Sequence, residues 1–163
     1  MIRRATPADV DAIAALFTRS FATLDFLPKL HTPDEDRRFL GRVLAEQDVW
    51  VAEWDGRVVG FIALDGDLGT FFYVDPAEHG EGAGSALFET AQRARPDGFE
   101  FWVFQRNEKA RAFYERRGCR AVRLTDGSGN EEKEPDVLYE WRPARASSPA
   151  PTSAAAARGS SAR

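Results

Sequence analysis

Apolar residues recur three or four positions apart in two segments near the N-terminus. The first segment follows Thr6-Pro7-Ala8-Asp9 and runs to Phe21, and the second follows Thr32-Pro33-Asp34-Glu35 and runs to Leu44. Threonine before a helix, proline at its first position and an acid at its third form a helix start signal. The pattern therefore predicts two amphipathic helices, joined by a loop over residues 26–31.

The pattern changes between Val49 and Val74. Three runs rich in β-branched and aromatic residues occupy 49–54, 57–64 and 68–74, and the dipeptides Asp55-Gly56 and Asp65-Gly66 separate them. An Asp-Gly pair between two short apolar runs is typical of a tight hairpin turn. This stretch is predicted to be an antiparallel meander of three strands.

The C-terminal half alternates between helices and strands. One helical pattern begins near Gly82 and is ended by Pro96, and another is capped by Asn107 and stopped by Gly118. Further strands are predicted at 2–5, 99–104, 121–124 and 137–141. Only the step from strand 68–74 through a helix to 99–104 requires a parallel pair. We therefore expect an α/β (α+β) chain with about four helices and a mixed, mostly antiparallel seven-stranded sheet.

Length and composition fit one domain. The chain has 163 residues, of which 43% are apolar, enough to fill a single core. Residues 143–163 contain no Leu, Ile, Val or aromatic residue and are rich in Ala, Ser and Pro. Such a segment cannot bury apolar surface, so we expect a folded domain at 1–142 and a disordered tail at 143–163.

The charge balance and the single cysteine restrict the partners and the compartment. Residues 1–142 carry 19 basic and 26 acidic residues, a net charge of −7, which argues against a nucleic-acid partner. Cys119 alone excludes an internal disulfide, and no stretch approaches the ~18 apolar residues of a membrane helix. We expect a cytoplasmic protein that does not enter a membrane.

A glycine-rich loop, His79-Gly80-Glu81-Gly82-Ala83-Gly84, joins strand 68–74 to the following helix. Backbone N–H groups in such a loop, together with the helix dipole, can bind a phosphate group. The P-loop signature requires a lysine that this loop lacks. The dinucleotide fingerprint requires G-x-G-x-x-G, whereas the sequence here is G-x-G-x-G and follows hairpins.

Two motifs resemble the GNAT superfamily of N-acetyltransferases. Val74-Asp75-Pro76 followed by Gly80-x-Gly82-x-Gly84 is similar to that family's pyrophosphate motif, and the segment from Asn107 through Phe113-Tyr114 to Gly118 is similar to its N-x-x-A-x-x-F-Y-x-x-x-G segment. The resemblance extends from Ile2 to about Trp141. It implies an acyl-CoA N-acyltransferase fold with a splayed parallel pair, and an acyltransferase that uses acetyl-CoA and no metal. His79 departs from the family, which usually has Gln or Arg there.

The resemblance also implies roles for individual residues. Tyr114 is expected to be the general acid that protonates the CoA thiolate, with simple packing as its alternative role. Asn107 is expected to bind the pantetheine arm, to cap its helix, or to do both. The residues that the resemblance assigns to acetyl-CoA are Phe72, Tyr73, Val74, His79, Gly80, Glu81, Gly82, Ala83, Gly84, Ser85, Asn107 and Tyr114.

The acceptor is less well defined by the sequence. Strand 68–74, where some members of the family place a catalytic Glu, has no carboxylate, so the sequence does not assign the general base. Glu53, His31 and an ordered water molecule stay open as candidates. Leu27 and Phe101 are expected either to form walls of the acceptor site or to pack in the core. The acidic loop 125–135 suits a cationic acceptor, either a small-molecule amine or a peptide amine. A homodimer, as in many relatives, and a non-catalytic acyl-CoA-binding or sensing module both stay open.

Overall fold

A seven-stranded sheet runs through the computed structural model, which describes residues 1–80 and 82–144. The strand order is β1-β2-β3-β4-β5-β7-β6, and β4 and β5 form the parallel pair. This confirms the predicted mixed sheet. All but the first two residues of the predicted tail lie outside the described residues. The strands are β1 (Ile2–Arg4), β2 (Asp48–Trp54), β3 (Arg57–Asp65), β4 (Leu68–Val74), β5 (Phe99–Phe104), β6 (Arg120–Leu124) and β7 (Asp136–Trp141).

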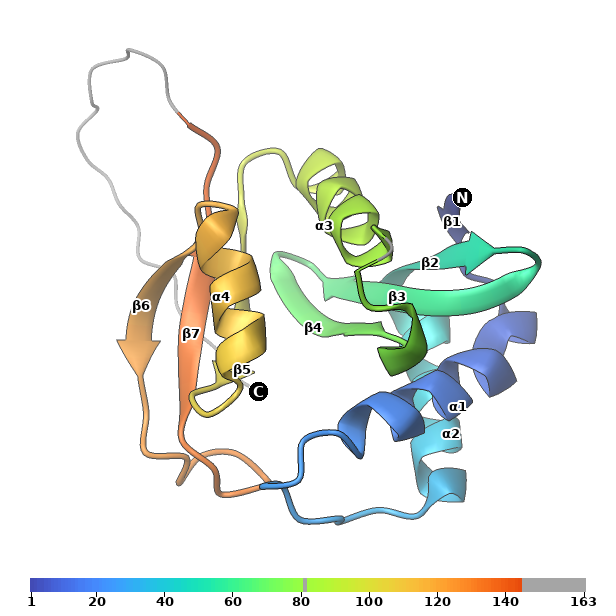
Figure 1. The fold of residues 1–163 in the computed structure, drawn as a ribbon, viewed down its shortest axis with the longest axis horizontal. Coiled ribbons are helices and arrows are strands. Elements are labelled where there is room, and N and C mark those ends of the chain that lie inside the picture. Colours follow the sequence, from blue (N-terminus) through green and yellow to red (C-terminus); the bar gives the residue numbers. More distant parts are fainter. Residues whose placement is uncertain (81, 145–163) are drawn as a thin grey trace.

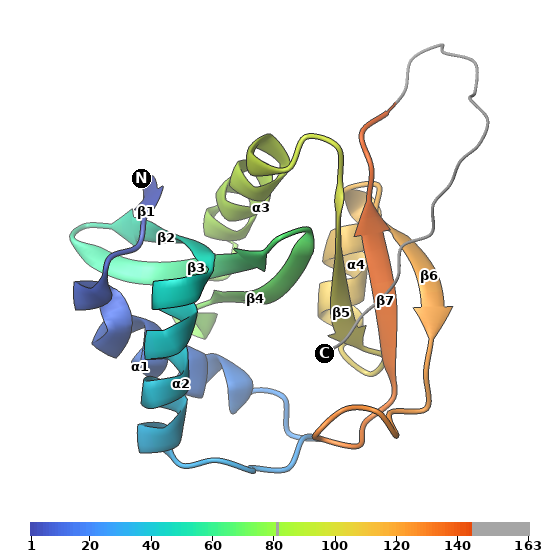
Figure 2. The same ribbon diagram turned by 180° about the vertical axis from the view of Figure 1, so that it is seen from behind.

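Helices cover both faces of this sheet. In Figures 1 and 2, α1 and α2 lie on one face of the β1–β4 part and α3 lies on the opposite face, while α4 lies against β5 and β7. The α-helices in the described part of the chain are α1 (Val10–Phe21), α2 (Pro33–Glu46), α3 (Ala83–Ala94) and α4 (Glu108–Arg116). Short 3-10 turns, η1 (Pro7–Asp9) and η2 (Pro76–Glu78), precede α1 and α3.

The second helix, α2, begins at the capping residues that the sequence predicted. Thr32 Oγ1 accepts the N–H of Glu35 at 3.1 Å, and the Glu35 carboxylate accepts the N–H of Thr32 at 2.9 Å. Each bond satisfies a backbone donor that the first turn of α2 leaves unpaired. At the first predicted helix, Asp9 accepts the N–H of Thr6 at 2.8 Å, but the chain forms η1 before α1 begins.

Asp9 provides a test of this start signal. Its buried carboxylate also accepts two hydrogen bonds from Arg3, at 2.9 and 3.0 Å, and these bonds hold the pKa of Asp9 below its usual value. A lowered folded-state pKa gives stability that is complete above the unfolded pKa, near 3.8, and is lost as the pH falls through the folded value. We expect Asp9→Asn to cost about 1–3 kcal/mol at pH 7, and less below pH 4.

Urea unfolding at several pH values measures this difference. The matched control is Asp11→Asn, because Asp11 is 76% exposed and pairs with an exposed Arg37. A difference between wild type and Asp9→Asn that is independent of pH would show that the ionised carboxylate is not the stabilising group.

The sheet splits between β4 and β5. The ladder between these strands comprises two register pairs, Leu68 with Glu100 and Gly69 with Phe101. A Cβ at Gly69 would lie 3.3 Å from the Cβ of Phe101, so glycine permits the close approach of the strands at this point. At Thr70 the register with β3 shifts by one residue, a β-bulge that bends β4. Beyond it the β1–β4 arm and the β5–β7–β6 arm diverge, as Figure 1 shows.

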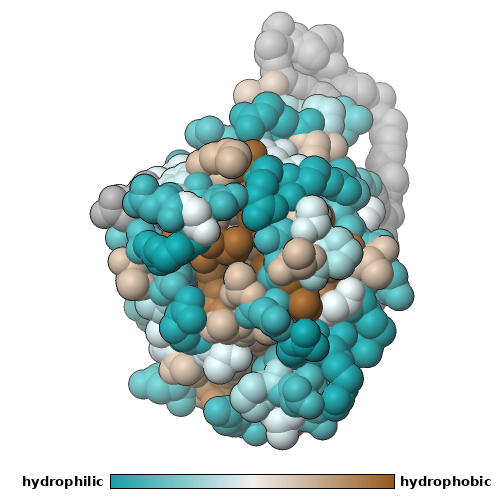
Figure 3. Space-filling view, turned by 90° about the vertical axis from the view of Figure 1, so that its right-hand side faces the viewer, coloured by the Kyte–Doolittle hydropathy of each residue, from teal (hydrophilic) through white to brown (hydrophobic). Residues whose placement is uncertain are grey.

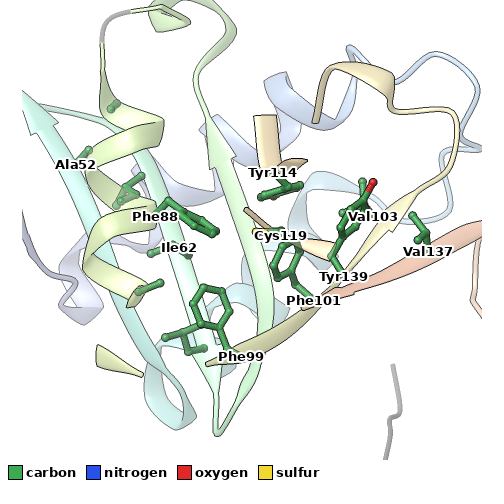
Figure 4. Close-up of a cluster of buried hydrophobic side chains, with 14 of the residues drawn as sticks. Ala52, Ile62, Phe88, Phe99, Phe101, Val103, Tyr114, Cys119, Val137 and Tyr139 are labelled. Atoms are coloured by element: carbon green, nitrogen blue, oxygen red, sulfur yellow. The ribbon is translucent and has the colours of Figure 1, made fainter. Parts of the chain in front are cut away.

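Two apolar clusters form the core, one on each face. Alternation along β4 divides its side chains: Phe72 packs toward α3 and α4, and Phe71 and Tyr73 pack toward α1. Figure 4 shows the first cluster, in which Phe88 of α3 and Tyr114 of α4 join side chains of both arms. The split in the sheet is therefore bordered by apolar groups from both arms.

Candidate active site

A cavity of about 130 Å³ occupies the split between β4 and β5. It brings together five residues that the sequence predicted for the site, namely Phe72, Tyr73, Phe101, Asn107 and Tyr114. Leu24, in the loop after α1, also lines it, whereas Leu27 does not. The remaining lining residues are Ile62, Leu64, Gly69, Thr70, Phe71, Phe88, Phe99, Trp102, Val103, Phe104 and Ala110.

Tyr114 lies at the wall of this cavity on the α4 side. It is 8% exposed, and its ring centroid is 4.4 Å from that of Phe101 and 6.1 Å from that of Phe72. Burial raises the pKa of the Tyr114 hydroxyl well above its ordinary value of 10. The group is therefore a neutral O–H donor at physiological pH, which is the state that a general acid requires.

The backbone of β4 borders the other side of the cavity. The carbonyl of Val74 points away from β3, because it accepts hydrogen bonds from Ser20 Oγ and His79 Nε2, each at 3.2 Å. Residues two apart in a strand direct their backbone groups to the same side, so the N–H and C=O of Phe72 also face away from β3, into the split. The bulge that bends β4 lies at Thr70, two residues before the segment 72–74 that the resemblance assigns to acetyl-CoA.

The predicted phosphate loop leads into the N-terminus of α3. Gly82 is the N-cap, and the φ angles of Gly80 (91°) and Gly82 (89°) lie in the left-handed region that favours glycine. A Cβ at either glycine would have no heavy atom within 4 Å, so the space beside the loop is open. Ala83, Gly84 and Ser85 form the first turn, and their N–H groups face no helical partner. The predicted Glu81 lies outside the described residues.

Arg117, which our sequence analysis did not select, lies beside this first turn. Its guanidinium donates to Ser85 Oγ and to the carbonyl of Phe113 at 3.1 Å, and it stacks 3.5 Å from the centroid of the Phe113 ring. In the described part of the chain, no carboxylate forms an ion pair with it. A cation at the positive end of a helix dipole is unfavourable unless an anion joins them. The pairing spans 32 residues, so no local pattern could reveal it.

Asn107 has a confirmed structural role. Its Oδ1 accepts the N–H of Ala110 at 3.2 Å and so caps α4. Asn107 also lines the cavity. Its backbone carbonyl accepts the N–H of Arg111, four positions later. The cap fixes the start of the helix that carries Tyr114, so Asn107 positions the hydroxyl whether or not it also binds ligand.

Two loops meet at the open end of the split. His31 Nε2, in the loop between α1 and α2, lies 2.8 Å from Glu131 Oε2 in the β6–β7 loop. This carboxylate raises the pKa of His31. The Arg106 guanidinium stacks 4.7 Å from the Phe26 ring centroid and forms a two-bond ion pair with Glu134. Both views of the ribbon show these loops crossing below the gap between the arms. His31 therefore joins the two arms, outside the cavity lining.

Glu53, the other predicted candidate for the base, lies elsewhere. It is at the end of β2, where its carboxylate accepts a hydrogen bond from Arg3 Nε at 2.7 Å. It lines a separate depression with Asp9, Arg19 and Arg57, and not the cavity in the split. Figure 3 shows the face at the right of Figure 1, where hydrophilic side chains surround a few apolar ones. The structure does not bring Glu53 together with Tyr114.

Residues 1–80 and 82–144 contain neither a candidate metal site nor a candidate membrane-spanning helix. No group of three or more His, Cys, Asp or Glu side chains in these ranges is placed to hold a metal ion. Within the same ranges, every helix is too short or too polar to cross a bilayer.

Sequence comparison identifies relatives along most of the chain. A profile described as an acetyltransferase (GNAT) domain matches residues 45–119. An uncharacterized N-acetyltransferase of Archaeoglobus fulgidus is 32% identical over 147 residues, which cover 80% of this chain and 99% of the relative. The peptidyl-lysine N-acetyltransferase YjaB of Salmonella typhimurium is 32% identical over 123 residues, covering 74% of this chain and 83% of that protein.

Solved structures share the fold. The solution structure of apo YjaB from Escherichia coli superposes with a TM-score of 0.71 at 27% identity, covering 86% of this chain and 95% of YjaB. PaiA N-acetyltransferase from Thermoplasma acidophilum, crystallised with coenzyme A, superposes with a TM-score of 0.70 at 15% identity, covering 87% of this chain and 98% of PaiA. At this identity the similarity shows the fold alone. Taken with the two motifs that meet at the split in the sheet, these relatives show that the chain belongs to the GNAT family of acetyltransferases and is an acyltransferase.

Proposed function

We propose that this protein transfers the acetyl group of acetyl-CoA directly to a primary amine, and that the acceptor is a lysine side chain of a peptide or protein. The observation that carries this proposal is the cavity in the split, which Phe72 of β4 and Tyr114 of α4 both line. The acceptor class rests on the relatives named YjaB, which are peptidyl-lysine N-acetyltransferases.

The residues fit acetyl-CoA as a substrate. The first turn of α3 and the open space beside Gly80 and Gly82 offer N–H groups to a pyrophosphate, and Arg117 adds a cation. His79 keeps its Nε2 on the Val74 carbonyl, so we assign to Arg117 the hydrogen-bond donors that a Gln or Arg at position 79 usually contributes in the family. The backbone of Phe72 would pair with the pantetheine arm, and Asn107 lies across the split from it.

The chemistry follows from the two sides of the split. A neutral amine attacks the acetyl carbonyl, and a β4 backbone N–H that faces the split stabilises the negative oxygen of the tetrahedral intermediate. When the carbon–sulfur bond breaks, the sulfur takes a proton from the Tyr114 hydroxyl, and the proton released by the new amide nitrogen restores that hydroxyl. Tyr114 suits this role because burial keeps it protonated.

A pair of matched peptides tests the acceptor class. One peptide has a blocked N-terminus and a single lysine, and the other has a free N-terminus and no lysine. We expect acetylation of the lysine peptide only, with one CoA thiol released per acetyl group, as measured by mass spectrometry and a thiol assay. Acetylation of the free N-terminus alone would contradict the proposed acceptor.

Arg117→Gln should weaken acetyl-CoA binding without slowing the chemistry. Loss of one charged hydrogen bond corresponds to roughly a 10- to 100-fold rise in the KM for acetyl-CoA, and kcat should stay unchanged. The neighbouring Arg116→Gln is the matched control, because Arg116 is exposed. Steady-state kinetics at low and high salt measure the effect. An equal KM in both variants would remove Arg117 from the site.

A further inference from the structure

The turn between β4 and the phosphate loop is tied to α1 by a buried carboxylate. Asp75, the residue after β4, is 7% exposed, and its Oδ2 accepts a hydrogen bond from Arg19 Nη2 of α1 at 2.6 Å. Its Oδ1 accepts the N–H of Ala77 at 3.1 Å and so caps η2. In Figure 1 this turn lies between β4 and α3, next to α1. One side chain therefore both starts η2 and fixes it to α1.

Two further contacts hold the same segment. Ser20, the neighbour of Arg19 on α1, donates from its Oγ to the Val74 carbonyl at the end of β4, at 3.2 Å. Arg57 of β3 pairs with Glu78 of η2, also at 3.2 Å. Arg57 is 60% exposed, and an ion pair of this length at the surface contributes little. The short pair of Arg19 with a buried carboxylate is therefore the main anchor of η2.

The phosphate loop depends on this anchor for its position. It follows η2 directly, with His79 as the C-cap of the turn. A Cβ at Gly80 or Gly82 would meet no heavy atom within 4 Å, so the fold does not pack against the loop there. Glycine permits the φ angles near 90° but does not enforce them. The shape of the loop is thus set where η2 ends and where α3 begins.

The carboxylate of Asp75 is ionised and depends on Arg19 for its counter-charge. Burial raises the pKa of Asp75, but the hydrogen bonds from Arg19 and from the N–H of Ala77 outweigh burial and hold this pKa below its usual value. The Asp75 side chain is only 10% exposed, so removal of Arg19 would leave a buried charge without a cation. Such a group is costly unless the structure around it opens to water. Loss of the pair should therefore loosen η2.

We infer that Asp75 and Arg19 are positioning residues that hold the phosphate loop in the shape that binds the pyrophosphate of acetyl-CoA. The inference rests on the proposed use of acetyl-CoA at this site. Arg19 lines the depression that contains Glu53, and neither Arg19 nor Asp75 lines the cavity in the split. The pair acts through η2, by raising the fraction of molecules whose loop is ready to bind.

Two acetyl donors separate this role from general damage to the fold. Acetyl-CoA carries the pyrophosphate, whereas S-acetylpantetheine has the same thioester and arm without it. Calorimetry with the full-length protein measures the binding of acetyl-CoA, and competition with acetyl-CoA measures the binding of S-acetylpantetheine. We expect Arg19→Gln to lower the affinity for acetyl-CoA roughly 5- to 20-fold and to leave the affinity for S-acetylpantetheine unchanged. The KM for acetyl-CoA should rise while kcat stays the same.

Matched variants test whether the ion pair itself is responsible. Arg19→Lys should restore most of the affinity, because it keeps the charge. Arg38→Gln removes an exposed pair with Asp34 on α2 and should behave like the wild type. Asp75→Asn should act like Arg19→Gln, and the double variant should bind little more weakly than either single one.

The possible outcomes distinguish this inference from the proposed function. Unchanged acetyl-CoA affinity in Arg19→Gln, an equal loss of affinity for both donors, or no binding of acetyl-CoA by the wild type would overturn the inference. Binding of acetyl-CoA by the wild type without CoA release in the presence of any amine would instead refute the proposed function. The titrations would still report on the ion pair in that case.

Discussion

Tyr114→Phe should lower kcat by about 10²- to 10⁴-fold, the contribution of a positioned general acid. Removal of the hydroxyl leaves the CoA thiolate to depart without a proton donor, while the ring keeps its contacts with Phe101 and Phe72. The affinity for acetyl-CoA should change little, because the phosphate loop and Arg117 are untouched. CoA release under saturating substrates measures kcat, and calorimetry measures the binding of acetyl-CoA.

The stability of this variant distinguishes chemistry from packing. The Tyr114 hydroxyl has no hydrogen-bond partner in the described part of the chain, so its loss should leave the melting temperature nearly unchanged. Tyr139→Phe is the matched control, because its hydroxyl accepts from Arg111 at 3.0 Å and donates to Glu115 in a structural network. Tyr139→Phe should lower stability more than kcat. Unchanged turnover in Tyr114→Phe would remove this residue from the mechanism.

Phe88→Ala should have the largest effect on folding. Phe88 is 2% exposed, and its ring contacts those of Phe72, Phe99 and Phe113, so it joins α3 to β4, β5 and α4. Truncation of a buried phenylalanine costs about 3–5 kcal/mol through lost burial and the cavity left behind. This cost is a large share of the free energy of unfolding of a whole domain, which is typically about 5–15 kcal/mol.

Denaturant unfolding of the full-length protein measures this loss. The control is Phe39→Ala on α2, because Phe39 is 46% exposed and its replacement should cost much less. Since Phe88 also lines the cavity, acetyl-CoA should stabilise Phe88→Ala less than it stabilises the wild type. Equal free energies of unfolding for Phe88→Ala and Phe39→Ala would show that the cluster in Figure 4 does not stabilise the sheet where it splits.

Local signals made most of the fold predictable. The capping sequence at Thr32 acts through bonds to a residue three positions away, and the turn at Asp55-Gly56 needs only the positive φ angles that both residues adopt. The motif that carries Asn107 and Tyr114 also acts within one short helix, which brings both residues to the cavity. Features of this kind depend on a few neighbouring residues, so the sequence displays them directly.

Other features arise only when distant segments meet. The bulge at Thr70 depends on the register between β3 and β4, and the pairing of Arg117 with Ser85 depends on how α4 lies against α3. The contact between His31 and Glu131 joins residues 100 positions apart. Glu53 was a reasonable candidate from its charge, but its partner Arg3 is brought to it by the pairing of β1 with β2. Tertiary structure, and not local pattern, decides which charges reach the site.

The release of CoA thiol from acetyl-CoA, with and without pools of amines, tests the central claim most directly. The control is Gly82→Trp, which places a large side chain in the open space beside the phosphate loop and in a φ of 89° that it tolerates poorly. The account predicts release that depends on the amine, is greatest with lysine peptides and is lost in the variant. Binding of acetyl-CoA by the wild type without release in the presence of any amine would contradict it, and would indicate a module that binds acyl-CoA without reacting.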